Sequence, residues 1–166
     1  MKRAAGFTLV ELVVVLILLG IVAAVGGARF FDLQTYRTRA WIDQITVTTS
    51  YARAMAIANR GQKVRLVYDS GTISAALAAD CSTATTTPLA NPSGNGVLNL
   101  SAPDGVTLAV SGQTLPYGIC LDSLGRPRDT ASAAGALLTG ITTLQVTGAG
   151  GTTPIYLEPE TGFVHL

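Results

Sequence analysis

An apolar run from Phe7 to Ala28 constrains the fold of this 166-residue chain more than any other feature. The run has 22 residues, and Glu11 carries its only charge. As a helix it would be roughly 33 Å long, which matches a hydrocarbon core of about 30 Å. Lys2 and Arg3 precede the run, and such positive flanks stay on the cytoplasmic side. The sequence therefore predicts a membrane-spanning helix over residues 7–28 with a cytoplasmic N-terminus.

Two ordinary interpretations of this run leave Glu11 without a role. A cleaved secretory signal has an apolar stretch of about 7 to 15 residues and then a small-residue site, which "AAVGGA" could supply. This run is longer, and a secretory signal has no use for a carboxylate beside its basic end. A plain single-span anchor would carry a charge that costs about 2.5 to 3.5 kcal/mol at the bilayer centre. Another alternative is that Glu11 merely snorkels to the interface.

The residues around position 6 resemble the signature of type IV pilins and pseudopilins. They read "GFTLVEL" behind a short basic leader, with a Glu at a fixed offset from the Gly. The resemblance implies that prepilin peptidase removes residues 1–6 by cutting between Gly6 and Phe7, and that the new amine of Phe7 is N-methylated. It also makes Glu11 an assembly residue, because its carboxylate would meet the cationic Phe7 amine of a neighbouring subunit. An unpaired charge in low dielectric is costly, so this pairing would favour joining a filament.

Residues 29–60 have the pattern of an amphipathic helix that continues the apolar one. Side chains suited to packing recur every three or four residues, and arginines take the other faces. The packing positions are Leu33, Tyr36, Ala40, Trp41, Ile45, Thr48, Ala52, Met55 and Ala58. "NRG" would then end the helix, with Gly61 suited to a left-handed cap.

From residue 61 to residue 166 the hydrophobic period changes from 3.6 to 2. Short alternating segments such as "KVRLVYD", "GTISAAL" and "ITTLQVT" are separated by turn residues. "EPETG" predicts a closing hairpin, and "ADCSTATTTPLANPSGNG" has the composition of a surface loop. Charged residues are only 13% and Gly reaches 18 residues, which suits a β domain. We expect an α+β fold in which a long N-terminal helix packs on an antiparallel β-rich domain.

Two cysteines lie in this domain, Cys81 in the polar loop and Cys120 in the segment "YGICLD". An even pair outside the cytoplasm favours a disulfide, and two free thiols are the alternative. A bridge closing about 40 residues would contribute on the order of 4 kcal/mol in the chain-entropy model. We expect Cys81 and Cys120 to be bonded.

The overall pattern resembles the GspH/FimT family of minor pseudopilins and minor pilins, and "ICLDSLGRP" is also similar to MSHA-type pilus proteins. The shared elements are the leader, the helix end "SYARAMAIANRG", "C.DS.GRP" and the closing "P.TG.V" hairpin. The resemblance implies a type IV pilin-like fold and a single-pass inner-membrane protein with a periplasmic globular domain. Such a protein enters a type IV pilus or a type II secretion pseudopilus, priming assembly or lying near the tip. Its partners would be other pilins, prepilin peptidase and the inner-membrane assembly platform.

Enzymatic and metal-binding functions lack the residues that they need in this sequence. His165 is the only histidine, and no Ser or Cys lies at a recognised catalytic spacing from it. One histidine and two separated cysteines cannot form a zinc cluster. We therefore expect no catalytic residues, no cofactor and no metal.

DNA binding is the alternative function, because some FimT-type minor pilins bind DNA through a C-terminal Gly-Arg-x-Arg motif. Here "GRPR" places Arg126 and Arg128 before the closing hairpin, which itself reads "TGFVHL". Asp122 and Asp129 flank both arginines, and the net charge of the chain is only +1. Because phosphate binding needs clustered and unneutralised cations, we expect little DNA affinity from Arg126 and Arg128.

Overall fold

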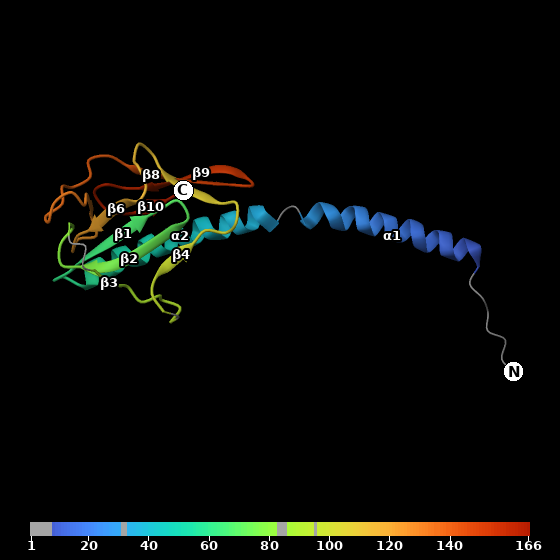
Figure 1. Cartoon of the computed structure of the whole chain (residues 1–166), viewed down its shortest axis with the longest axis horizontal. Coiled ribbons are helices and arrows are strands. Elements are labelled where there is room, and N and C mark those ends of the chain that lie inside the picture. Colours follow the sequence, from blue (N-terminus) through green and yellow to red (C-terminus); the bar gives the residue numbers. More distant parts are fainter. Residues whose placement is uncertain (1–7, 31–32, 83–85, 95) are drawn as a thin grey trace.

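The chain consists of a projecting helix and a globular body (Figure 1). The computed structural model describes residues 8–30, 33–82, 86–94 and 96–166, and the side chains of all of these except residues 25–30. Helix α1 covers Leu9–Phe30 and extends away from the body, whereas α2 covers Leu33–Ala58 and lies along it. Residues 31–32, where the two halves of the expected helix would join, lie outside the described ranges. Among the described residues, no helix combines the length and the hydropathy needed to cross a membrane.

The body contains two antiparallel sheets. The larger has the order β3-β2-β1-β6-β7, and β4 also pairs with β2. Its strands are β1 (Lys63–Tyr68), β2 (Thr72–Ala78), β3 (Thr86–Pro88), β4 (Asn99–Ser101), β6 (Tyr117–Leu121) and β7 (Pro127–Arg128). The smaller has the order β10-β9-β8-β5, formed by β5 (Thr107–Val110), β8 (Thr142–Gly148), β9 (Gly151–Leu157) and β10 (Val164–His165). This architecture confirms the expected α+β fold.

The core lies where α2 meets the two sheets, because α2 contacts β1 and β6 of one sheet and β8 and β10 of the other. Trp41 and Ile45 are buried on the inner face of α2. In β1 every second side chain is buried, as the period of 2 predicts. The last of these, Tyr68, places its hydroxyl 3.4 Å from Thr49 Oγ1. Burial raises the pKa of Tyr68 to about 12, so the phenol stays neutral in the core.

Helix α2 ends at Ala58, before the cap that the sequence predicts at Gly61. The backbone N–H and the side-chain Nδ2 of Asn59 both donate to the Met55 carbonyl, at 2.9 Å each. Gly61 is not among the glycines with positive φ, so the predicted left-handed cap is wrong. An asparagine that satisfies a terminal carbonyl makes such a cap unnecessary.

Two strands lie in segments that the sequence predicts as loop or turn. β3 falls within the polar segment after Cys81, and β7 falls within "GRPR". Both are short edge strands held by a neighbour, β3 by β2 and β7 by β6. Their pairing is tertiary, which short-range periodicity does not reveal.

The end of the body opposite α1 is formed by three segments that meet, and we call it the distal end. They are the last turns of α2, the turn 122–126 between β6 and β7, and the turn 158–163 between β9 and β10. Arg53 of α2 donates from Nε to the Thr161 carbonyl at 2.6 Å. Gly162 lies so close to the Gly125 carbonyl that a Cβ at position 162 would collide with it.

Candidate functional site

The first candidate site is the start of α1, where Thr8 caps the helix. The carbonyl of Thr8 accepts a hydrogen bond from the Leu12 N–H at 3.2 Å, and its Oγ1 accepts one from the Glu11 N–H at 3.3 Å. Thr8 and Glu11 thus occupy the N-cap and N3 positions of a T-x-x-E capping box. The partial positive charge of a helix N-terminus also favours a carboxylate there. This capping role of Thr8 was missed at the sequence level, although the T-x-x-E spacing that signals it is present.

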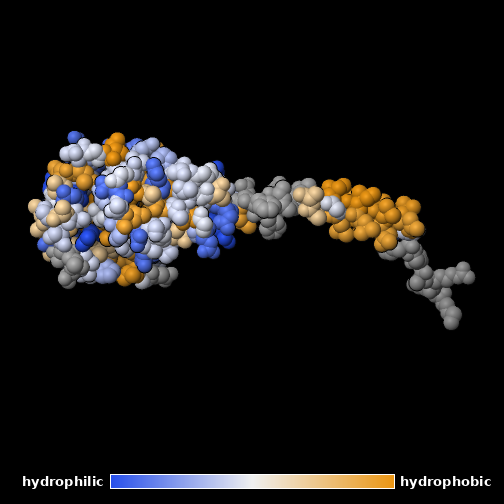
Figure 2. Space-filling model, turned by 45° about the horizontal axis from the view of Figure 1, so that its top comes forward, coloured by the Kyte–Doolittle hydropathy of each residue, from blue (hydrophilic) through white to orange (hydrophobic). Residues whose placement is uncertain are grey.

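The side chains of α1 that the structure describes, those of residues 9–24, are exposed, including the large apolar ones. Leu9 is 79% exposed and Val15, the least exposed of these large residues, is still 43% exposed. Figure 2 shows the contrast, with a continuous hydrophobic surface on the coloured part of this helix and a mixed surface on the body. Glu11 is exposed within that hydrophobic surface. An apolar surface of this extent marks a contact with other protein or with lipid.

The predicted processing site lies outside the residues that the structure describes. Gly6 and Phe7, the residues on either side of the expected cut, belong to residues 1–7, whose placement is not described. Cleavage and N-methylation there stay predictions.

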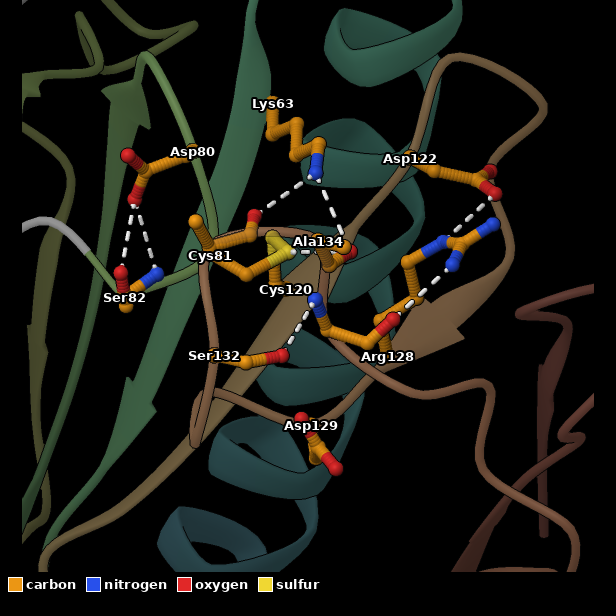
Figure 3. Close-up of a disulfide and its surroundings, with 12 residues drawn as sticks. Lys63, Asp80, Cys81, Ser82, Cys120, Asp122, Arg128, Asp129, Ser132 and Ala134 are labelled. Atoms are coloured by element: carbon orange, nitrogen blue, oxygen red, sulfur yellow. Dashed lines mark hydrogen bonds and ion pairs between the residues drawn. A yellow bond between two sulfur atoms is a disulfide. The ribbon is translucent and has the colours of Figure 1, made fainter.

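A disulfide joins Cys81 to Cys120 near the distal end (Figure 3). Their Cα atoms are 5.4 Å apart, and 39 positions separate them in the sequence. The bond ties the loop after β2 to strand β6, and the Cys81 N–H also donates to the Ala133 carbonyl at 3.0 Å. Lys63 Nζ donates to the carbonyls of Ala133 and Ala134, at 3.1 and 3.2 Å. The bridge therefore lies at the centre of a fixed cluster of loops.

Beside the disulfide, Asp122 organises the turn between β6 and β7. Its Oδ1 accepts hydrogen bonds from the N–H groups of Leu124 and Arg126, at 2.9 Å each. Its Oδ2 is 3.0 Å from Arg126 Nη2 and 3.0 Å from Arg128 Nε. Arg128 also donates from Nη1 to the Gly135 carbonyl at 2.9 Å. One carboxylate thus fixes the turn and both guanidinium groups.

The pKa of Asp122 reflects two opposing causes. Burial is the largest single one and disfavours the carboxylate, because only 6% of the residue is exposed. The hydrogen bonds from Arg126, Arg128 and Leu124 together outweigh it. The pKa of Asp122 is therefore lowered, and the carboxylate remains ionised at a pH low enough to protonate an ordinary carboxyl group.

Arg126 and Arg128, the residues weighed for DNA contact, point into this network rather than forming an open basic stripe. Both share Asp122, so one of their two charges is neutralised within the turn. Asp129 does not add to this pairing. Its Oδ1 accepts hydrogen bonds from the N–H groups of Ala131 and Ala136, at 3.2 and 3.1 Å.

His165 lies on the surface of the closing hairpin. Its Nε2 is 3.0 Å from Glu158 Oε1, and its ring stacks on Phe163 with centroids 5.9 Å apart. The hydrogen bond with Glu158 is the main reason that the pKa of His165 is raised. This contact joins β10 to the turn after β9 and steadies the hairpin.

Three comparisons relate this chain to known proteins. Residues 1–27 match the model of the prokaryotic N-terminal methylation motif. The chain is 39% identical over 54 residues to the type IV narrow pilus major component PilA5 of Thermus thermophilus. That alignment covers 32% of this chain and 47% of PilA5, so the chain spans about half the length of this relative.

The third comparison concerns the fold of the whole molecule. The structure is similar to the minor pseudopilin EpsH from the type 2 secretion system of Vibrio cholerae, with a TM-score of 0.54. The match covers 78% of this chain and 95% of EpsH at 14% sequence identity, which shows a shared fold. The chain therefore combines an N-terminal methylation motif with a type IV pilin-like fold.

Proposed function

We propose that the protein is a minor subunit of a type IV pilus or of a type II secretion pseudopilus, of the GspH/FimT kind. The observation that carries this proposal is α1, an exposed apolar helix that bears one carboxylate and begins within the methylation motif. A helix of this kind needs a covering of lipid before assembly and of other helices afterwards. The role is structural, without catalysis.

The proposed sequence of events begins at the leader. Prepilin peptidase cuts between Gly6 and Phe7, and the amine of Phe7 is methylated. The chain then waits in the inner membrane as a single-pass protein with its body in the periplasm. The assembly platform transfers α1 from lipid into a bundle of other pilin helices, where the Phe7 amine of one subunit pairs with Glu11 of another.

The pairing gives α1 a reason to leave the lipid. A charge at the centre of a bilayer costs about 2.5 to 3.5 kcal/mol, and an opposite charge reduces that cost. The N-terminus of α1 also carries partial positive charge, which lowers the cost of Glu11 while the subunit waits. In the bundle, the full positive charge of a Phe7 amine would be a stronger partner.

DNA binding has less support than assembly. Arg126 and Arg128 share Asp122, so together they present about one net charge to a phosphate backbone. Because affinity for DNA grows with the number of phosphates neutralised, a single net charge contributes little.

Fractionation of the native host tests the proposal. Glu11→Ala should reach the membrane fraction as wild type does but should be depleted from sheared filaments, or from pseudopili where these can be overproduced. Val14→Ala is the matched control, because Val14 is an exposed apolar residue of the same helix and carries no charge. Equal incorporation of Glu11→Ala and wild type would contradict the assembly role of Glu11.

A further inference from the structure

The basic side chains of the body are concentrated at the distal end. Residues 61–166 contain four basic residues against seven acidic ones, so this part of the chain is acidic as a whole. Three of those four basic residues nevertheless line one cavity of about 400 Å³, together with a fourth cation from the end of α2. The four cations are Arg60, Lys63, Arg126 and Arg128. Among the described residues that line this cavity, Asp122 is the only carboxylate.

Most of these cations are held in fixed positions, and Asp122 does not neutralise all of their positive charge. Both oxygens of Asp122 are already engaged by the turn and by Arg126 and Arg128. Lys63 is bound to two backbone carbonyls, which orient the ammonium group and leave its charge uncompensated. The side chain of Arg60 is exposed, and it has no ion pair or hydrogen bond to any described residue. The cavity is therefore a preorganised cationic site with a surplus of positive charge.

An apolar ledge lies directly beside this cavity. A second cavity shares Arg60, Ser123 and Leu124 with the first, and it adds Ile57 from α2. Leu124 is 63% exposed and Ile57 is 42% exposed. The distal end thus offers a cationic cavity and an apolar surface next to each other.

We propose that the distal end binds an acidic peptide segment of a partner protein. A carboxylate of that segment enters the cavity among Arg60, Arg126 and Arg128, and an adjacent apolar side chain covers Leu124 and Ile57. Guanidinium groups bind carboxylates with good geometry, and fixed donors lose little entropy on binding. A phosphodiester strand would leave the apolar ledge uncovered.

This inference goes beyond the proposed function and does not depend on it. The site lies at the end of the body opposite α1, and α1 contributes no residue to it. Its test also uses the single chain, whereas the assembly proposal is tested by filament incorporation. The two can therefore fail separately.

The test is an NMR titration of the full 15N-labelled chain in maltoside micelles, whose headgroups carry no phosphate. The probes are acetyl-Leu-Glu-Leu-amide, the matched acetyl-Leu-Gln-Leu-amide, inorganic phosphate and a thymidine oligonucleotide. The Glu peptide should shift the amide signals of Ser123, Leu124 and Arg126 saturably, and it should bind about tenfold more tightly than the Gln peptide. Arg60→Gln should weaken the Glu peptide several-fold, whereas Arg39→Gln, which removes an exposed arginine elsewhere on α2, should not.

Further results distinguish the acidic peptide from phosphate and from the oligonucleotide as the ligand of this site. Leu124→Ser should weaken the Glu peptide and leave any phosphate binding unchanged, because only the peptide uses the ledge. Equal binding of the Glu and Gln peptides, or insensitivity to Arg60→Gln, would overturn the proposal. Saturable binding of phosphate or the oligonucleotide without binding of the Glu peptide would overturn it as well.

Discussion

Thr8 Oγ1 accepts a hydrogen bond from the Glu11 N–H at 3.3 Å, so the residue expected to pair between subunits also lies in the N-terminal cap of its own helix. The two roles make different demands on the side chain. Capping needs only an oxygen that can reach back toward the Thr8 backbone, and glutamine can supply it. Pairing with a cationic amine in a low dielectric needs the charge itself.

Glu11→Gln separates these two roles. If charge pairing drives assembly, this variant should enter sheared filaments as poorly as Glu11→Ala does. Thr8→Ala, which removes the cap oxygen and keeps the charge, should cost about 1 kcal/mol at the helix start and leave incorporation largely intact. Immunoblots of filament and membrane fractions give the measurement. Normal incorporation of Glu11→Gln would contradict the charge pairing.

The Cys81–Cys120 bridge should be a large contributor to the stability of the body. It closes a loop across 39 positions, so its loss is expected to cost on the order of 4 kcal/mol in the chain-entropy model. The variant Cys81→Ser/Cys120→Ser should unfold at much lower urea concentration than wild type. The fluorescence of Trp41 reports this, because it is the single tryptophan and it is buried in the core. Adding reductant should lower the midpoint of wild type and leave the double variant unchanged, and an unchanged wild-type midpoint would contradict the prediction.

Asp122 should make stability depend on acid pH. Its folded pKa lies below the ordinary value of 3.8, so its contribution is present above that value and is lost as the pH falls through the folded pKa. Asp122→Asn retains an oxygen for the Leu124 and Arg126 N–H groups but loses the bonds to the two guanidinium groups. It should destabilise the body by about 2 kcal/mol at pH 7.

Urea denaturation at pH 7 and at pH 3 checks the sign of this effect. The difference between wild type and Asp122→Asn should shrink on acidification, because protonated Asp122 no longer binds the arginines as an anion. Asp129→Asn is the control, because this neighbouring carboxylate forms no ion pair in the network and its Asn variant keeps the Oδ1 acceptor. A difference that stays constant or grows between pH 7 and pH 3 would count against the proposed network.

Gly162 should be intolerant of a side chain. It has φ +65°, and a Cβ there would collide with the Gly125 carbonyl of the neighbouring turn. Gly162→Ala should therefore cost more than Gly112→Ala, which has φ +71° and open space around it. Backbone strain alone is about 1 kcal/mol, so Gly112→Ala measures that part and the excess measures the close contact. Equal losses would mean that the two distal turns are not held together as described.

Much of the fold could be predicted from local sequence patterns. The change of hydrophobic period at residue 61 marks the boundary between α2 and the strands, and β1, β2 and β8 lie where alternation predicts them. The strands β3 and β7 could not be found in this way, because each is two or three residues long and is held by a neighbouring strand. The cap at Gly61 was wrong because Asn59 completes the helix end first.

The candidate sites also fall into two groups, those that a local sequence signal predicts and those that only the tertiary structure reveals. The carboxylate in the apolar run and the N-terminal motif are local signals, and the cysteine pair follows from its number and compartment. The network around Asp122 joins residues up to six positions apart, and its aspartates were noted at the sequence level only as flanking charges. The cationic cavity joins Arg60 and Lys63 to Arg126 and Arg128 across the body, and only tertiary structure brings these residues together.

The central claim is that the chain is processed as a prepilin and then used as a filament subunit. Intact-mass and N-terminal peptide mass spectrometry of the protein isolated from its native host tests it most directly. The account predicts a chain that begins at Phe7 and carries one methyl group on its amine. An intact leader, or a cut near Ala28 that releases a free body, would contradict it.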